Sequence, residues 1–450
     1  MDETGSPNDP WPKRKQMGSL VLHNAVIVGG DGGHSVVDAT VVVQNGRIGA
    51  VGSREEALPV PDTGPVLDLT GKWLIPGLIN CHDHVFNKAV RNVRAGLPLA
   101  DSRQKIFNKP DLYLVLESAF NVLQELHQGV TTICDLGSRR GMAIQLRNAI
   151  VDGLVLGPRI LAAGEAVTMT GGHFYMVSRQ ADGPDEVRKA VREQLHAGAD
   201  CIKLMASGGL TSLPSENPGQ EQFTVEELQA GVEEAHKAGR RVAAHAQATL
   251  AVRNAVEAGV DSIEHGFFLD DDTVRVMRKQ GTHFVPTLNV PINVVRQMRV
   301  AGDLDLVDYM EREVLAAHRD AFLRAADAGL LIAAGTDSAG LMAEELETMV
   351  DFGLSPAEAL ATATRDAAVV CDINSDTGTI EPGKLADMVI LNENPLHDIR
   401  AVRNVVGVIR GGVLFERDTQ IPISTRNLPL SRGAVGHPTP SRLTVETGVG

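Results

Sequence analysis

Between residues 76 and 370 the chain alternates short apolar segments, typical of buried strands, with amphipathic stretches typical of helices. One helical stretch, residues 224–238, opens with Thr224 three residues before Glu227, which is a capping-box pair. Eight strand–helix units can be counted, the last strand ending at Asp337. Because parallel strands need helical crossovers and eight of them close a ring, this pattern predicts an α/β fold with a (β/α)8 TIM barrel over residues 76–370.

Both ends of the chain instead have short strand patterns separated by turns. The predicted strands lie at residues 20–28, 39–43, 48–52, within 378–391 and at 405–413. Asn45-Gly46 between two of them is a hairpin signal. We therefore predict a small β-sandwich domain formed from both chain ends, residues 19–75 plus 371–417.

The remaining ends are predicted to be tails. Residues 1–18 have no apolar core of a signal peptide and are expected to be disordered. Residues 418–450 are rich in Pro, Gly, Ser and Thr and are expected to form a C-terminal tail.

The composition limits the classes of partner. The formal net charge is −15, which argues against nucleic acid or an anionic membrane surface, because both need a basic footprint. No run of 18 apolar residues is present, so we expect no membrane-spanning helix. The four cysteines lack CxxC spacing and are typical of reduced thiols in a cytoplasmic enzyme.

Metal-competent side chains recur where the predicted barrel strands end. His82 and His84 stand two residues apart, which on a strand places both imidazoles on one face. His245, His265 and Asp337 end three later strands. Catalytic groups of a barrel lie at these carboxyl ends, and imidazole and carboxylate suit zinc and similar divalent ions. The sequence therefore predicts a metal site at this face of the barrel.

Lys203 lies on another of these strands and has two interpretations. As a charged ammonium it would repel a metal ion and would simply extend toward solvent from the strand end. As a buried, neutral amine it would react with carbon dioxide to give a carbamate, an anionic ligand able to bridge two metal ions.

These residues carry a resemblance to a known family. The set His82, His84, Lys203, His245, His265 and Asp337 resembles the metal-dependent amidohydrolase superfamily, as do residues 76–79 and 378–387. Segments 169–173, 202–209 and 262–266 are similar to its imidazolonepropionase/prolidase-like branch, which includes Xaa-Pro dipeptidases, ochratoxin hydrolases, and molinate and phenylurea hydrolases. One departure is Asn80, which stands where relatives usually have Asp just before the paired histidines.

The resemblance implies a binuclear metal centre, with zinc as the expected ion and manganese, cobalt or iron as alternatives. One ion would be bound by His82, His84, Asp337 and a bridging carbamate on Lys203. The other would be bound by that carbamate, His245 and His265. A metal-bridged hydroxide would attack the substrate, while Asp337 acts as general base and then acid.

The same resemblance implies hydrolysis of a C–N bond in an amide, carbamate or urea, and we expect a small, partly apolar substrate. The residues expected near the substrate are His173, which is also a catalytic candidate, Tyr175, Gln222 and Phe223. A Xaa-Pro-type dipeptidase or carboxypeptidase is the alternative. A deaminase is less favoured, because such enzymes generally use one metal and lack a bridging lysine. Relatives also imply a homo-oligomer.

Overall fold

The computed structural model describes residues 19–29, 35–53, 56, 58, 64–87, 108–209, 217–338 and 340–416. The two predicted tails lie outside the described residues. Within the described part of the chain, no helix is both long and apolar enough to cross a membrane.

Parallel strands form two neighbouring sheets in the middle of the molecule. One sheet has the order β6-β7-β8, and the other β10-β9-β11-β12-β13-β14. Their bounds are β6 Leu78–Asp83, β7 Val130–Asp135, β8 Arg159–Ala162, β9 Val167–Thr168, β10 Arg179–Gln180, β11 Ile202–Met205, β12 Val242–Ala246, β13 Ser262–His265 and β14 His283–Val285. β6, β7, β8, β11, β12, β13 and β14 lie where the apolar segments predicted strands, whereas the two-residue strands β9 and β10 were not predicted.

The last predicted strand, residues 331–337, forms isolated bridges instead of a regular strand. Ile332 pairs in parallel with Phe284 of β14, and Asp337 pairs in parallel with Asp83 of β6. Between them the Ala334 N–H donates to the carbonyl of Thr362, outside the ladder. The segment therefore links the two parallel sheets, although its ladder is interrupted.

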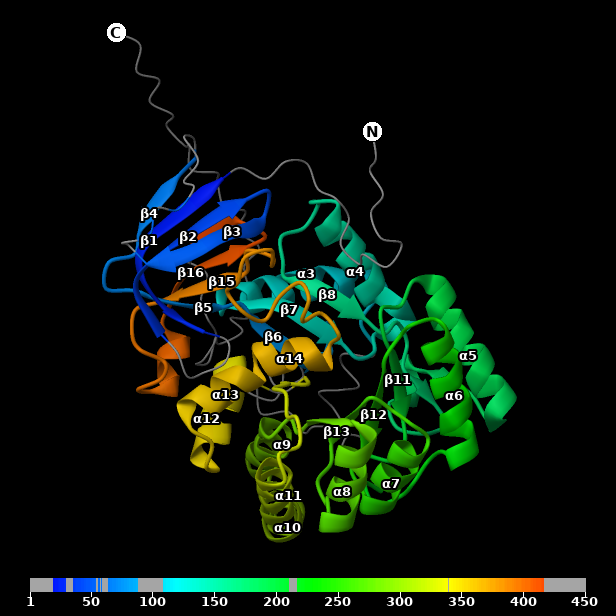
Figure 1. Cartoon of the computed structure of the whole chain (residues 1–450). Helices are drawn as coiled ribbons and strands as arrows, with labels where there is room; N and C mark the ends of the chain where they lie inside the picture. Colours follow the sequence, from blue (N-terminus) through cyan, green and yellow to red (C-terminus); the bar gives the residue numbers. More distant parts are fainter. Residues whose placement is uncertain are drawn as a thin grey trace, which may run out of the picture.

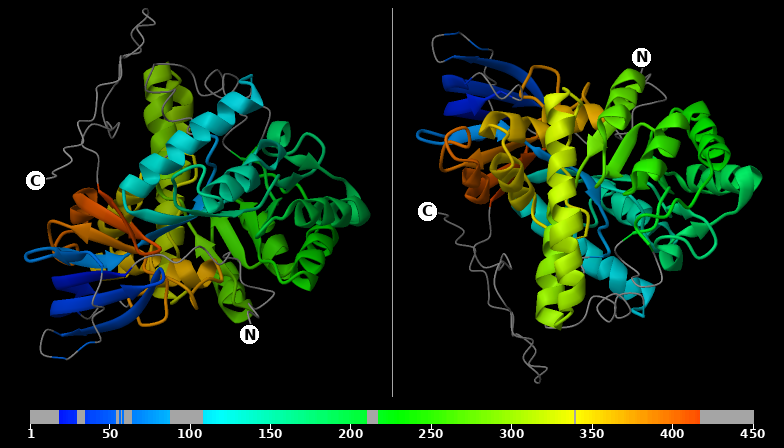
Figure 2. Two further views of the ribbon diagram at one scale, coloured as in Figure 1. Left: turned by 90° about the horizontal axis from the view of Figure 1, so that it is seen from above. Right: turned by 90° about the horizontal axis from the view of Figure 1, so that it is seen from below.

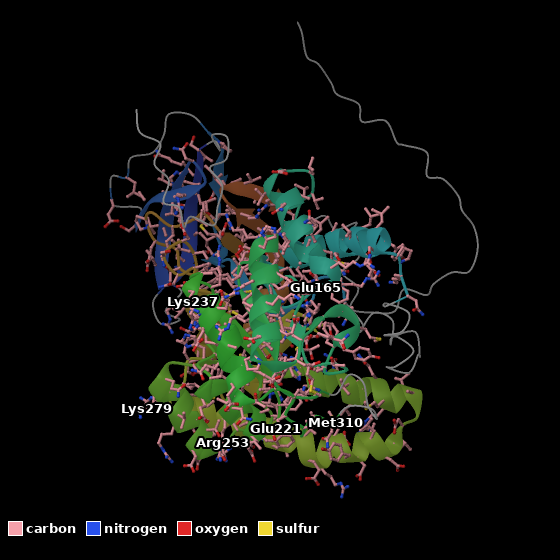
Figure 3. The ribbon with its side chains drawn as sticks, turned by 90° about the vertical axis from the view of Figure 1, so that its right-hand side faces the viewer. Glu165, Glu221, Lys237, Arg253, Lys279 and Met310 are labelled. Carbon is pink, nitrogen blue, oxygen red and sulfur yellow. The ribbon has the colours of Figure 1, made fainter. Side chains whose placement is uncertain are left out.

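Helices cover the outside of the parallel strands (Figure 1). The first group is α3 Asp111–His127, α4 Met142–Val151, α5 Gly183–Ala197, α6 Val225–Lys237, α7 Thr249–Glu257 and α8 Asp271–Gln280. The capping box predicted at the start of α6 is present, because Thr224 accepts from the Glu227 N–H and Glu227 accepts from the Thr224 N–H. Charged residues lie on the outward sides of these helices, as Lys237, Arg253 and Lys279 do in Figure 3.

A second group of helices follows β14. These are α9 Asn289–Ala301, α10 Leu304–Tyr309, the π-helical turn η3 Met310–Leu315, α11 Ala316–Asp327, α12 Met342–Asp351, α13 Pro356–Thr362 and α14 Arg365–Val370. The helices from α9 to α11 form a long antiparallel pair that stands beside the strands (Figure 2). Short 3-10 turns complete the helices: η1 Arg139–Gly141, η2 Tyr175–Val177 and η4 Ile399–Arg403.

A separate eight-stranded sheet takes strands from both ends of the chain, and the β-sandwich stays a prediction. Its order is β17-β16-β15-β5-β1-β2-β3, with β4 paired to β1. The bounds are β1 Leu20–Val28, β2 Ser35–Gln44, β3 Arg47–Ser53, β4 Val66–Asp68, β5 Trp73–Pro76, β15 Met388–Leu391, β16 Val405–Arg410 and β17 Val413–Glu416. The predicted Asn45-Gly46 turn joins β2 to β3, both residues having positive φ.

The sheet from the chain ends is fixed to the parallel strands by packing and charge. Antiparallel pairing of β15 with β5 brings the C-terminal strands beside the segment that leads into β6. A buried ion pair joins Arg159 of β8 to Asp387 just before β15. Each region has its own core, and the larger one lies between the parallel strands and their helices. The segment that leads into β6 is therefore fixed to the sheet formed by the chain ends.

Candidate metal centre

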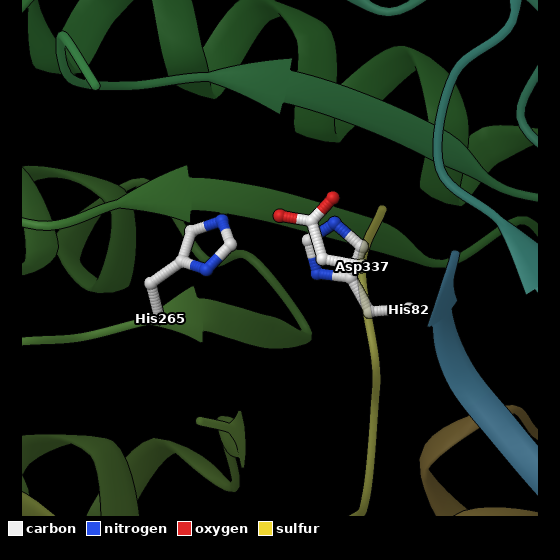
Figure 4. A group of neighbouring side chains, drawn as sticks. All are labelled: His82, His265 and Asp337. Atoms are coloured by element: carbon white, nitrogen blue, oxygen red, sulfur yellow. The ribbon is translucent and has the colours of Figure 1, made fainter. Parts of the chain in front are cut away.

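Two buried histidines and a partly buried aspartate from separate segments converge at the carboxyl ends of the parallel strands. His82 lies near the end of β6, His265 ends β13, and Asp337 ends the bridging segment. One ligand atom of each lies within 4.8 Å of the others. Figure 4 shows the three side chains pointing toward one another. Such a set fits a divalent ion with imidazole and carboxylate ligands.

The other predicted histidines border this group. The ring of His84 lies 5.4 Å from that of His82, and its Nε2 is 3.6 Å from Asp337 Oδ1. The ring of His245, on β12, lies 4.7 Å from that of His265. All four imidazoles are buried. The strand-end positions predicted from the sequence are thus brought together in space.

Each imidazole has one ring nitrogen beside a protein partner. His84 Nδ1–H donates to Gly137 O over 2.7 Å, and His245 Nε2–H donates to Gly208 O over 3.1 Å. A backbone carbonyl only accepts, so these contacts fix the tautomer and leave the second nitrogen with its lone pair. Metal-bound histidines in proteins commonly have such partners.

The two remaining imidazoles have side-chain partners. His265 Nδ1 lies 2.7 Å from Thr287 Oγ1. His82 Nδ1 lies 2.8 Å from Glu264 Oε2, although the geometry is not that of a directed hydrogen bond. In both rings this leaves Nε2 as the candidate ligand.

Burial keeps these imidazoles neutral. It lowers the pKa of His82, His245 and His265 well below the usual imidazole range, and that of His84 to a smaller extent. A neutral imidazole has the lone pair that a metal ion needs.

Asp337 is the anionic member of the site. Burial would raise the pKa of its carboxyl, but the neighbouring His82 and His84 rings, the amide of Ser338 and Lys203 oppose burial and lower the pKa to about 2. Its backbone is left-handed, with φ 51°, as are those of His265 at 74° and Thr287 at 50°. Non-glycine residues adopt this region at a cost, and strained backbone of this kind is often found at active sites.

Lys203 is fully buried on β11, and burial lowers the pKa of its amine. Its Nζ has no hydrogen-bond partner among the residues that the structure describes. Nearby carboxylates of Glu264 and Asp337 act in the opposite direction, raising the pKa. Burial of an amine without a hydrogen-bond partner costs free energy, so Lys203 is a candidate for a role in the site.

Asn80 has a structural role. Its Oδ1 accepts from the Thr336 N–H over 3.1 Å, and its Nδ2 donates to Thr336 Oγ1 over 2.8 Å. An aspartate at this position could accept from the Thr336 N–H but could not donate to the Thr336 hydroxyl oxygen. The amide of Asn80 can do both, which suits this link between β6 and the bridging segment. The carboxylate beside His82 comes instead from Glu264, on β13.

The residues predicted to contact the substrate lie in different environments. His173 is buried, stacks on His245 at 4.2 Å, and donates its backbone N–H to Gln222 Oε1 over 2.7 Å. Tyr175 is exposed on η2. Phe223 packs into the main hydrophobic core, so its burial is accounted for by packing. Substrate contact stays a prediction for all four.

Several supporting residues were not predicted. Thr287 and Gly137 bind ring nitrogens, and the ring of Phe174 lies 5.0 Å from that of His84. Thr287 lies two residues beyond the end of β14, so its place near a strand end was an available signal. A Cβ on Gly209 would lie 2.3 Å from Cε1 of His173, which explains a glycine there.

The protein is thus built on parallel strands, and side chains that can bind a metal ion come together at the carboxyl ends of these strands. A family model described as Amidohydrolase family matches residues 73–415. The chain belongs to this family, whose members are generally metal-dependent, and it is a hydrolytic enzyme that acts on C–N bonds. The predicted family resemblance is confirmed.

Individual relatives cover most of the chain. It is 30% identical to ochratoxinase of Aspergillus niger over 433 residues, 88% of this chain and 86% of that protein. It is 30% identical to the crystal structure of a Xaa-Pro dipeptidase with bound methionine, with a TM-score of 0.79 and coverage of 88% and 100%. Molinate hydrolase, 20% identical with a TM-score of 0.76 and coverage of 94% and 100%, shows similarity of fold alone.

Proposed function

We propose that the protein hydrolyses an amide, carbamate or urea bond of a small, partly apolar molecule at a binuclear divalent-metal centre. The observation that carries this proposal is that each of four buried imidazoles has one nitrogen beside a protein partner and the other available, around an ionised Asp337. Supporting architecture would be a closed (β/α)8 barrel over residues 76–370, with a β-sandwich from 19–75 and 371–417.

The donor set fits two ions that share a ligand. His82, His84 and Asp337 would bind one, and His245 and His265 the other. Bound divalent ions supply Lewis acidity, which polarises a carbonyl and lowers the pKa of a water toward neutrality.

Lys203 would provide the shared ligand. Its burial, its lowered amine pKa and its lack of a partner among the described residues support reaction with carbon dioxide. The N–C bond forms, the amine loses one proton, and the product is a carbamate anion with two oxygen ligands. The buried amine would thereby become an anion, and its negative charge would compensate the positive charge of the ions.

Asp337 would move the proton. Its low pKa keeps it ionised at neutral pH, so it can accept a proton from the attacking water and return it to the leaving nitrogen. His173 stacks on His245 and would orient the substrate carbonyl beside the reacting atoms.

An apolar wall supports a partly apolar substrate. Phe174 lies against His84, its ring is 6.1 Å from that of Phe86, and both belong to a cluster with Met142 and Met205. Apolar walls with a few polar groups are typical of small-molecule sites.

Metal analysis and a substrate panel test the proposal. We expect two divalent ions per chain and turnover of ochratoxin-type amides, phenylureas or thiocarbamates. Lys203→Ala should abolish activity, and short carboxylates should restore part of it by replacing the carbamate. One ion per chain together with a fully active Lys203→Ala variant would overturn the binuclear centre.

A Xaa-Pro dipeptidase is the second candidate, supported by the similarity to the dipeptidase structure. The same panel should then include Xaa-Pro and N-acyl dipeptides. Turnover of dipeptides alone, at the same metal content, would favour this candidate and exclude the apolar substrate.

A further inference from the structure

The four cysteines, far apart in the sequence, gather at one place below the candidate metal centre. They come from β6, β7, the residue before β11 and the end of α14, and they are Cys81, Cys134, Cys201 and Cys371. All four line a single cavity of about 80 Å³. Its lining also includes Val242 and Ser262, which start β12 and β13. The cavity thus lies mainly at the amino ends of these strands, and Glu264, whose carboxylate lies beside His82, also lines it.

The Cys371 thiol interacts with both Cys81 and Cys134, and Cys134 also contacts Cys201. Cys371 Sγ lies 3.6 Å from Cys81 Sγ, and Cys134 Sγ lies 3.8 Å from Cys201 Sγ. A tetrahedral metal site would need three or four sulfurs at mutual distances of about 4 Å. Among the described residues, only His82, His265 and Asp337 form a group of three ligand atoms within 4.8 Å of one another. The arrangement favours chemistry between two thiols over binding of one ion by four.

Each contact joins a partly exposed cysteine residue to a buried one. Cys371 and Cys201 are partly exposed, whereas Cys81 and Cys134 are 3% and 6% exposed. Oxidant-sensitive cysteines have this arrangement, in which an accessible thiol reacts first and a neighbouring thiol resolves the product.

We propose that Cys371 and Cys81 are a peroxide-reactive thiol pair that forms a disulfide between α14 and β6. The Cys371 sulfur attacks hydrogen peroxide, which breaks the O–O bond and gives a sulfenic acid and one water. The Cys81 thiol then attacks the sulfenic sulfur, forms the S–S bond and releases a second water. The two thiols lose two electrons and two protons, and the peroxide gains them.

The surroundings of Cys371 favour the first step. Hydrogen bonds from the thiols of Cys134 and Cys81, together with the charge of Arg241, lower the pKa of Cys371 well below the usual thiol range. Arg241 also lines the cavity and donates to the carbonyl of Val369, so its guanidinium is fixed beside the end of α14. Closing the 3.6 Å gap to a bond of about 2 Å needs a side-chain movement of roughly 1.5 Å.

Peptide mapping of the full-length wild-type protein tests the pairing. Trypsin places the four cysteines on four different peptides. The reduced protein is treated with hydrogen peroxide, alkylated and digested without reductant. We expect a cross-linked peptide that joins Cys81 to Cys371 in most molecules and disappears after dithiothreitol. Linkage of Cys371 to Cys134, or Cys371 sulfinic acid without a cross-link, would overturn the proposal.

Two serine variants form a matched pair of controls. Cys371→Ser removes the reacting thiol, and Cys81 should then stay reduced. Cys201→Ser removes the other partly exposed thiol, and the Cys81–Cys371 cross-link should persist. Equal loss of the cross-link in both variants would contradict a specific pair. The wild-type map alone decides the proposal if a variant fails to fold.

Discussion

Two clusters of reactive side chains share the parallel strands, and they are built differently. In the candidate metal centre, each histidine has a protein partner that is not itself a candidate ligand. In the cysteine cavity, by contrast, the sulfur atoms mainly contact one another. The first arrangement fixes rings for an ion, whereas the second leaves neighbouring thiols free to react with each other.

In the metal centre, the segment that contacts His265 is itself fixed by further hydrogen bonds. Thr287 binds His265, and the next two residues, Leu288 and Asn289, donate their backbone N–H groups to the carboxylate of Glu345 over 2.7 and 3.0 Å. Glu345 is fully buried on α12. Rigid outer tiers of this kind preserve ligand geometry.

Replacement of the anionic ligand should have the largest effect. Asp337→Asn keeps the shape but removes the charge and the proton acceptor, so we expect kcat to fall by about 10²–10⁴-fold or more. Turnover of the best panel substrate and metal content by mass spectrometry measure this. Asp272→Asn, at an exposed carboxylate on α8, is the control and should be unaffected. An Asp337→Asn variant with normal turnover would remove this residue from the reaction.

Glu345 should make folding stability depend on pH. Burial raises the pKa of this carboxyl from 4.5 to about 7, although the amides of Asn289 and Leu288 oppose the shift. The folded state thus binds the proton more tightly than the unfolded state. This stabilisation is complete below about pH 4.5 and is lost as the pH rises through 7, a change of about 3 kcal/mol.

Urea unfolding of the wild type and Glu345→Gln across this pH range measures the difference. The glutamine cannot ionise, so the wild-type free energy of unfolding should fall relative to the variant as the pH rises. Glu381→Gln, at an exposed carboxylate, should follow the wild type. Parallel curves for the wild type and Glu345→Gln would show that this carboxyl keeps its ordinary pKa.

Thr287 tests the partner of a single histidine. Thr287→Val removes the hydroxyl beside His265 Nδ1, and we expect metal affinity to fall about 10–100-fold. Competition with a chelator measures the affinity, and Thr287→Ser, which keeps the hydroxyl, should retain most of it. Equal loss in both variants would point to the left-handed backbone of this residue instead of its hydroxyl.

The sequence predicted what depends on short-range pattern. The Asn45-Gly46 hairpin, the α6 capping box and the bounds of β13 follow from neighbouring residues. The histidines and Asp337 were predicted from one rule, that neighbouring parallel strands end on the same face, whereas Lys203 became a candidate ligand through the family resemblance. Asp337 was found in this way even though its segment forms only isolated bridges.

What the sequence did not predict depends on packing between distant elements. Glu345 reaches the segment after β14 only because α12 packs there, and no local pattern marks it. Cys81 and Cys371 are 290 residues apart and meet because α14 lies against the end of β6. Spacing rules for cysteine pairs detect near neighbours, so the sequence predicted only that these four thiols are reduced.

The smallest effect is expected at Cys201, one of the places where the two clusters are near neighbours in sequence. Cys201 stands two residues before Lys203, yet its thiol contacts Cys134 in the lower cavity. Because this side chain is partly exposed and has no contact with a candidate ligand among the described hydrogen bonds, Cys201→Ser should change stability by about 0.5 kcal/mol or less and kcat by no more than about twofold. Metal content, turnover and urea unfolding of the reduced protein check this. Loss of metal in Cys201→Ser would mean that the thiols support Lys203, and that the two clusters act as one unit.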